Sequence, residues 1–159
     1  MTIEDDIAFL ERVPIFRRLG PPALRILAIG AESYQVQAGQ VLFTVGEAAD
    51  GGYIVQRGSF TLSGGHGEET DIVAGPGTLL GESALLTETK RPATARARED
   101  AMVLRISRSM FLRMLEGFPD AAERLRELFM SRADQWAREL ENVRAALGSD
   151  NAGDSAEPQ

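Results

Sequence analysis

Between residues 31 and 106 the chain consists of short runs rich in β-branched and aromatic residues, separated by turns that contain glycine. The Arg57-Gly58 pair and the Gly75-Pro76-Gly77 triplet are two of these turns. Short strands at close spacing, divided by turn residues, are typical of an antiparallel sandwich or roll and not of alternating strands and helices. We expect strands at residues 34–37, 41–43, 53–55, 60–62, 71–74, 94–98 and 102–106.

Residues 1–30, before the predicted strands, have apolar residues at helical spacing. Thr2 is placed to cap the first helix, and Asp5 lies three residues later, as in a capping box. Pro14 interrupts this helix. Pro21-Pro22 are placed to open a second short helix, because proline is favoured in a first helical turn.

A second helical region follows the predicted strands. Ser107 is placed to cap a helix over residues 108–116. A long helix is predicted from residue 120 to about residue 147, where Gly148 breaks the apolar pattern. Residues 148–159 are polar and acidic, and we expect them to form a disordered tail.

The composition excludes several classes of function. The formal net charge of −7 argues against nucleic acid as a partner, because duplex binding depends on Lys and Arg that neutralise phosphates. The chain has no cysteine, which excludes disulfides and thiol catalysis. No run approaches the roughly 20 apolar residues of a membrane span, and the acidic N-terminus is unlike a secretory signal. We therefore expect a cytoplasmic protein with no membrane contact.

The single histidine argues against catalysis. His66 lies in a glycine-rich stretch, and we interpret it as a residue at the tip of a hairpin. A metal-dependent enzyme of the cupin kind needs several converging imidazole or carboxylate ligands, and a Ser-His-Asp triad needs a positioned histidine. We predict that the chain is not an enzyme and holds no metal or cofactor.

Residues 80–95, LGESALLTETKRPATA, have the chemistry of a phosphate site. A buried phosphate diester needs converging backbone N–H groups, a guanidinium whose fork matches its oxygens, and an acceptor for a nearby sugar hydroxyl. Ser83 and Ala84 are placed to supply the amides, Arg91 the guanidinium and Glu82 the acceptor, and Gly81 lets the backbone approach closely. Taken alone, Glu82 also fits a solvated turn, and Arg91 an exposed loop pair with Lys90.

The same stretch resembles the cassette of the cyclic-nucleotide-binding domains found in the bacterial catabolite activator protein and the regulatory subunit of protein kinase A. That cassette reads roughly Phe-Gly-Glu-x-Ala-Leu and, after a short loop, Arg-Ala-Ala-Thr-Val. This chain has Leu80-Gly81-Glu82-Ser83-Ala84-Leu85 and Arg91-Pro92-Ala93-Thr94-Ala95 at the same interval. The resemblance extends over residues 13–147 and includes the stretches 38–43, 46–47, 53–58 and 108–119.

The resemblance implies an α+β fold: an eight-stranded antiparallel β-roll (a jelly roll, or double-stranded β-helix) flanked by N-terminal helices and by C-terminal B and C helices. Residues 1–147 would then form a single domain. Its parts would be the N-terminal helices at 1–30, the roll at 31–106 and the B and C helices at 107–147, followed by the tail at 148–159.

The resemblance also assigns roles to residues. Glu82 would accept from the ribose 2′-hydroxyl, Arg91 would pair with the cyclic phosphate, and Gly81 and Ala84 would make backbone contacts. The predicted ligand-binding set is Leu80, Gly81, Glu82, Ser83, Ala84, Arg91, Pro92, Ala93 and Thr94.

Two residues of the long helix are candidates for a lid over the base. Trp136 falls where the family's C helix presents a residue to the purine, and Arg132, one turn earlier, would reach back to Glu82. The alternatives are a core or dimer contact for Trp136 and a surface or interface position for Arg132.

Pro92 departs from the family pattern. The family residue at this position often donates a backbone N–H or a hydroxyl to the phosphate, and proline has neither. Loss of one charge-assisted hydrogen bond is worth about 1.5–3 kcal/mol, or roughly ten- to a hundredfold in affinity. Family members that prefer cyclic GMP often carry threonine here, so the departure favours cyclic AMP as the ligand and leaves cyclic GMP as the second choice.

Two functions fit the sequence. The first is a cyclic-nucleotide sensor that signals through its C-terminal helix to a separate effector protein, which the sequence does not identify. The second is a ligand-independent interaction module that pairs with itself, as a homodimer through the C-terminal helix, or with another protein. No helix-turn-helix follows residue 147, so we expect no direct contact with DNA.

Overall fold

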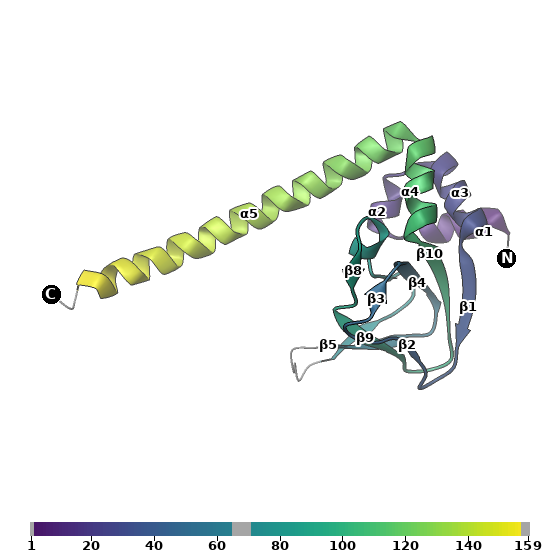
Figure 1. Cartoon of the computed structure of the whole chain (residues 1–159), viewed down its shortest axis with the longest axis horizontal. Coiled ribbons are helices and arrows are strands. Elements are labelled where there is room, and N and C mark those ends of the chain that lie inside the picture. Colours follow the sequence, from purple (N-terminus) through teal and green to yellow (C-terminus); the bar gives the residue numbers. More distant parts are fainter. Residues whose placement is uncertain (1, 65–70, 157–159) are drawn as a thin grey trace. The chain divides into compact units, whose positions relative to one another are not determined.

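The computed structural model of the chain describes residues 2–64 and 71–156. It divides into two compact units, Met1–Ala122 and Glu123–Gln159. The first unit holds the N-terminal helices, the strands and one further helix, and the second is the greater part of a single long helix (Figure 1). The hairpin tip predicted around His66 lies outside the described residues.

Three helices precede the strands: α1 (Ile3–Leu10), α2 (Pro14–Arg17) and α3 (Pro21–Gly30). The predicted capping box is confirmed, because the Thr2 hydroxyl accepts from the Asp5 amide and the Asp5 carboxylate accepts from the Thr2 amide. Pro21-Pro22 open α3, as expected. Pro14 does more than interrupt α1: it begins the short helix α2, where its missing N–H would have no intrahelical partner.

Eight strands form two four-stranded antiparallel sheets, which confirms the predicted roll. Seven of these strands correspond to runs expected from the sequence, whereas β7 is only two residues long and was not expected. One sheet has the order β1 (Glu32–Val36), β10 (Ala101–Ser107), β4 (Gly51–Arg57), β7 (Leu79–Leu80). The other has the order β2 (Val41–Phe43), β9 (Ala93–Ala97), β5 (Phe60–Gly64), β6 (Ile72–Ala74).

The interior of the roll is apolar and takes side chains from both sheets. Val55 and Val103 from one sheet, and Phe60 and Ala95 from the other, belong to one buried cluster. The burial of β10 alternates along most of its length, as expected for a strand with one face toward a core. Burial of a large apolar side chain is worth about 1.5–3 kcal/mol, so this cluster holds the two sheets together.

A third, two-stranded ribbon pairs β3 (Ala48–Ala49) with β8 (Thr89–Lys90). Between β7 and β8 lies the single 3₁₀ turn η1 (Ser83–Leu85), at the position where the sequence predicts one helical turn. The ribbon and η1 carry the two halves of the predicted cassette. The sequence analysis did not anticipate β3 and β8, since two residues are too few to produce an alternating pattern.

Two helices follow the strands: α4 (Arg108–Gly117) and α5 (Pro119–Ala156). Ser107 caps α4 as predicted, because its hydroxyl accepts from the Met110 amide at 3.2 Å. In Figure 1, α4 lies beside α3 at the end of the strands. Phe111 of α4 and Phe16 of α2 are both fully buried, with ring centroids 6.0 Å apart.

The predicted end of the long helix at Gly148 is wrong. In the structure α5 continues through this residue to Ala156, so the expected tail at 148–159 begins as helix. A glycine inside a helix costs only about 1 kcal/mol relative to alanine, and Ala145, Ala146 and Leu147 directly before it are strong helix formers. Along the described part of the chain, no helix is both long and apolar enough to cross a membrane.

Candidate ligand-binding site

Arg91 occupies a fixed position at the end of β8. Its amide donates to the Glu47 carbonyl at 2.8 Å, and its own carbonyl accepts from the Gly46 amide at 2.8 Å. Both bonds go to the turn before β3, so they extend the short β3–β8 ribbon by one residue. The Arg91 side chain is 4% exposed, which excludes the exposed loop pair with Lys90.

The guanidinium of Arg91 lies over two aromatic rings. Its central carbon is 4.4 Å from the ring centroid of Phe43 and 5.5 Å from that of Tyr53. The two rings are stacked, with centroids 6.0 Å apart. Burial lowers the pKa of Arg91 from its ordinary value, while the ring faces favour the cation. An arginine remains protonated in proteins, so a full positive charge is held inside the roll.

One nitrogen of this guanidinium lacks a partner. Among the residues that the structure describes, Nη1 of Arg91 is buried and has no hydrogen-bond acceptor. Leaving a buried donor unsatisfied costs about 1–3 kcal/mol, and more when the group is charged. Such an atom marks a place where an anionic acceptor would be bound strongly.

Gly81 lies directly against Arg91. A β-carbon on Gly81 would collide with Nη1 of Arg91 and would come within 3.2 Å of the Gly51 carbonyl. Gly81 also has a φ of +87°, a conformation that L side chains rarely adopt. The structure therefore brings together the glycine and the arginine of the predicted cassette, and both the space and the backbone conformation require glycine.

The 3₁₀ turn η1 uses one of the two amides predicted to meet a phosphate. The Ala84 amide donates to the Gly81 carbonyl at 3.1 Å, so it is engaged within the turn and not free as the sequence suggested. Ala84 is also fully buried, whereas Ser83 is exposed. Glu82 is partly buried at the start of the turn, with helical backbone angles.

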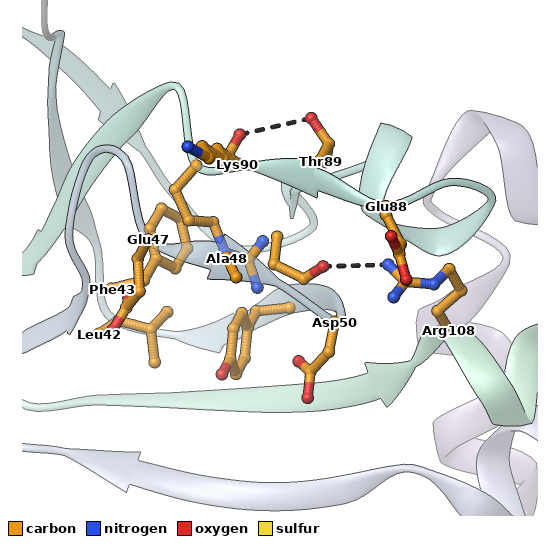
Figure 2. Close-up of a pocket in the computed structure, with 12 residues that line it drawn as sticks. Leu42, Phe43, Glu47, Ala48, Asp50, Glu88, Thr89, Lys90 and Arg108 are labelled. Carbon is orange, nitrogen blue, oxygen red and sulfur yellow. Dashed lines mark hydrogen bonds between the residues drawn. The ribbon is translucent and has the colours of Figure 1, made fainter.

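A cavity of about 830 Å³ opens beside Arg91 (Figure 2). Of the predicted ligand-binding set, Arg91 alone is among the residues that line it. Phe43, Tyr53 and Arg108 were not among the predicted site residues, although Phe43 and Tyr53 lie in stretches that resemble the family. The lining consists of Leu42, Phe43, Glu47, Ala48, Ala49, Asp50, Tyr53, Glu88, Thr89, Lys90, Arg91 and Arg108.

The other predicted cassette residues around Arg91 differ in exposure and in their partners. Pro92 is exposed, and Ala93 and Thr94 are partly buried in β9. The Thr94 hydroxyl accepts from the Val45 amide at 2.9 Å, so it connects β9 to the turn before β3. Leu80 is buried and pairs with Tyr53 across β7 and β4.

The two candidate lid residues belong to the second unit. The central carbon of the Arg132 guanidinium is 5.8 Å from the ring centroid of Phe129 on the same helix. The side chain of Trp136 lies outside the described residues. The capping of a base by Arg132 and Trp136 stays a prediction.

Comparison with known proteins gives consistent matches. A family model described as the cyclic nucleotide-binding domain matches residues 34–118, more than half of the chain. The chain is 30% identical over 120 residues to a cyclic nucleotide-gated potassium channel of Mesorhizobium japonicum, which covers 76% of this chain and 33% of the channel. It is 30% identical over 131 residues to the cyclic AMP receptor protein of Thermus thermophilus, covering 80% of this chain and 61% of the receptor.

A solved structure also matches over almost its full length. A cyclic nucleotide-binding-like protein from Brucella abortus superimposes with a TM-score of 0.63 and 44% sequence identity, over 70% of this chain and 98% of that protein. This chain therefore spans nearly all of one solved relative, but only 33% of the channel and 61% of the receptor.

Proposed function

Since the chain belongs to the cyclic nucleotide-binding domain family, we propose that it is a sensor that binds cyclic AMP in preference to cyclic GMP. The observation that supports this most is the buried guanidinium of Arg91, whose Nη1 has no acceptor within the described part of the chain and lies against Gly81. A cyclic phosphate would supply the missing anionic acceptor, and an arginine fork suits its paired oxygens.

The remaining cassette residues have supporting roles in this proposal. Glu82, partly buried beside Gly81, accepts from the ribose 2′-hydroxyl. The backbone near Gly81 and Ser83 approaches the phosphate. Pro92 removes one donor, which weakens binding by roughly ten- to a hundredfold relative to a residue with an N–H or hydroxyl. The absent hydroxyl is also the reason to prefer adenine over guanine.

The sensor acts by binding and not by catalysis. A ligand shifts a protein between two conformations only by its difference in affinity for them. We propose that α5 has two positions, that bound nucleotide favours one of them through Arg132 and Trp136, and that the altered surface recruits a separate effector protein.

The alternative is a ligand-independent module that pairs through α5, as a homodimer or with another protein. Pro92 favours this alternative, because a domain that no longer binds a ligand is expected to lose donors from its phosphate site. By helical spacing in the sequence, the face that includes Phe129, Trp136 and Val143 would be the contact surface. Leu140, from the same apolar stripe, is 53% exposed. In this case Phe129→Glu should convert a dimer to a monomer in analytical ultracentrifugation, and a dimer that persists would place the contact elsewhere.

Isothermal titration calorimetry with cyclic AMP and cyclic GMP tests the sensor. We expect saturable binding of cyclic AMP, weaker binding of cyclic GMP, and a loss of about a hundredfold in Arg91→Ala, equivalent to a charge-assisted hydrogen bond of about 3 kcal/mol. The matched control is Arg98→Ala, an exposed arginine after β9, which should bind as the wild type does.

Two results would contradict the proposal. Absence of heat with either nucleotide at about 1 mM would favour the interaction module. Equal affinity in the wild type and Arg91→Ala would remove Arg91 from the site. The lid has its own test, because the chain has one tryptophan: the fluorescence of Trp136 should shift at saturating ligand, and an unchanged spectrum would count against stacking.

A further inference from the structure

Arg108 is the first residue of α4 and also lines the cavity beside Arg91. Its backbone is fixed, because the Arg108 amide donates to the Asp50 carbonyl at 2.7 Å. The preceding residue, Ser107, pairs with Gly51 across β10 and β4. The start of α4 is therefore anchored to the segment that joins β3 to β4, on the wall of the cavity.

The Arg108 guanidinium reaches three backbone carbonyls that come from separate segments. Its Nη1 lies 3.0 Å from the Ala49 oxygen, 3.2 Å from the Ala84 oxygen and 3.1 Å from the Thr87 oxygen. Ala49 is in β3, Ala84 is in η1, and Thr87 lies in the loop that leads to β8. Figure 2 shows the Arg108 side chain, and the dashed line at its guanidinium marks the hydrogen bond to the Ala49 carbonyl.

The Arg108 cation offsets the electrostatic cost of bringing these carbonyls together. Three oxygens that converge on one point repel one another, and the Ala49 and Ala84 oxygens, whose bonds to Arg108 are partly buried, also lose solvation. A single nitrogen with two hydrogens shares its bonds among them, and its charge offsets the repulsion. The turn η1 is only three residues long, so it has little stability of its own and its last carbonyls have no intrahelical donor.

We propose that Arg108 is a positioning residue for the anion site. It does not touch the phosphate. It holds the carbonyl ends of η1 and of the following loop against β3, and so fixes Gly81, Glu82 and Ser83 at one place relative to Arg91. The proposal rests on the proposed function, in that the site it positions is the nucleotide site.

Substitution of Arg108 by lysine or by methionine distinguishes a role that needs its charge and donors from a role in packing alone. A lysine ammonium also carries a positive charge and three donors, so it can serve three carbonyls although its shape differs from a guanidinium. A methionine has similar length and apolar volume but no donor. If Arg108 acts as a cation for the three carbonyls, Arg108→Lys should restore what Arg108→Met loses.

The experiment has two arms, each on the full chain. Without ligand, amide exchange by NMR is measured at Leu85, Leu86 and Thr87, whose amides bond within η1. We expect exchange there to rise by about tenfold or more in Arg108→Met, equivalent to about 1.4 kcal/mol, and to stay within about threefold of wild type in Arg108→Lys. The matched control is Arg113→Met, an exposed arginine on the same helix, which should leave η1 unchanged.

With cyclic AMP, affinity should fall by about tenfold or more in Arg108→Met and recover to within about threefold in Arg108→Lys. Unchanged exchange of η1 in Arg108→Met would overturn the proposal. Thermal unfolding accompanies both arms. If Arg108→Met does not fold, Arg108→Lys alone tests the proposal. Amide exchange in η1 that rises about tenfold in a folded lysine variant overturns the proposal, and exchange within about threefold of wild type supports it.

The two arms separate this inference from the proposed function. If the wild type binds no cyclic nucleotide, the sensor fails, while the ligand-free exchange still reports whether Arg108 holds η1. If the wild type binds and Arg108→Met binds equally well, the sensor stands and Arg108 is not a positioning residue.

Discussion

Two arginines line the same cavity, and their surroundings are opposite. Arg91 lies over the Phe43 and Tyr53 rings with its Nη1 unpaired within the described part of the chain. Arg108 directs its Nη1 at three backbone carbonyls. Both residues are cations that line the same cavity, but Nη1 has three backbone acceptors in Arg108 and, among the described residues, none in Arg91.

The difference distinguishes the proposed binding group, Arg91, from the proposed positioning group, Arg108. A buried charge without an acceptor raises the free energy of the folded state, and evolution retains such groups where a ligand supplies the acceptor. A guanidinium nitrogen whose hydrogens are shared among backbone carbonyls contributes to folding. The two arginines should therefore respond in opposite ways to the same substitution.

The largest effect is expected at Gly81, where substitution would break the comparison by moving Arg91. In Gly81→Val the new side chain meets the guanidinium and the φ of +87° becomes strained. The left-handed backbone alone costs about 1–2 kcal/mol. We expect a loss of at least that much in urea unfolding and no binding of cyclic AMP by calorimetry. The control is Gly75→Val, where a β-carbon meets no neighbouring atom within 4 Å. Retained binding in Gly81→Val would show that Arg91 is not held by this contact.

The next largest effect is the difference in the free energy of unfolding between Arg91→Met and Arg108→Met. Removing Arg91 relieves an unsatisfied buried charge, so the free energy of unfolding should stay within about 0.5 kcal/mol of wild type or rise. Removing Arg108 leaves three carbonyls without their donor and should lower it by about 2 kcal/mol. Urea unfolding of the two variants measures both. Equal destabilisation would mean that the two arginines do not differ in the way proposed.

A smaller effect is expected at Phe43, whose ring is the nearer support of the Arg91 guanidinium. Phe43→Leu keeps an apolar side chain but removes the ring face, which is worth about 0.5–1 kcal/mol in cation–π attraction. Affinity for cyclic AMP should fall by about two- to fivefold. Tyr53→Leu should have a smaller effect, because its ring centroid lies 5.5 Å from the guanidinium and that of Phe43 lies 4.4 Å away. The reverse order would assign the support to Tyr53.

The smallest effect is expected at the capping box of α1, which serves as a baseline distant in sequence from both arginines. Hydrogen bonds from Thr2 hold the pKa of the Asp5 carboxyl below its ordinary value of 3.8. A carboxyl whose pKa is lower in the folded state stabilises the fold above its unfolded pKa and loses this contribution as the pH falls. Thermal unfolding of Asp5→Ala should therefore match wild type more closely near pH 2 than at pH 7. A difference that grows in acid would contradict this assignment.

The part of the site that follows from local spacing could be predicted. The interval from Gly81 to Arg91 and the short turn at residues 83–85 both depend on neighbours in sequence, and the structure places this glycine and arginine in contact. The pattern of short strands likewise predicted the roll. The C-terminal end of α5 and the two-residue strands could not be predicted, because one glycine does not end a helix and two residues show no periodicity.

The rest of the site depends on contacts between segments far apart in the chain. Phe43 and Tyr53 support Arg91 from two different sheets, and a sequence pattern assigns such residues simply to a core. Arg108 has the appearance of an ordinary charged residue at a helix start. Its role becomes visible only when Ala49, Ala84 and Thr87 are seen to converge on it.

Pro92 has a consequence for the chain before any ligand is bound. A residue that precedes proline is confined largely to extended backbone, which is the conformation of strands. Arg91, which exchanges hydrogen bonds with Gly46 and Glu47 on the adjoining turn, is therefore restricted in the unfolded chain as well. A proline that suits the native backbone stabilises a fold by about 0.4–1 kcal/mol, because fewer disordered conformations are lost. Pro92, which has no donor for the proposed phosphate, thus lowers the backbone entropy lost in fixing Arg91, the residue proposed to bind that phosphate.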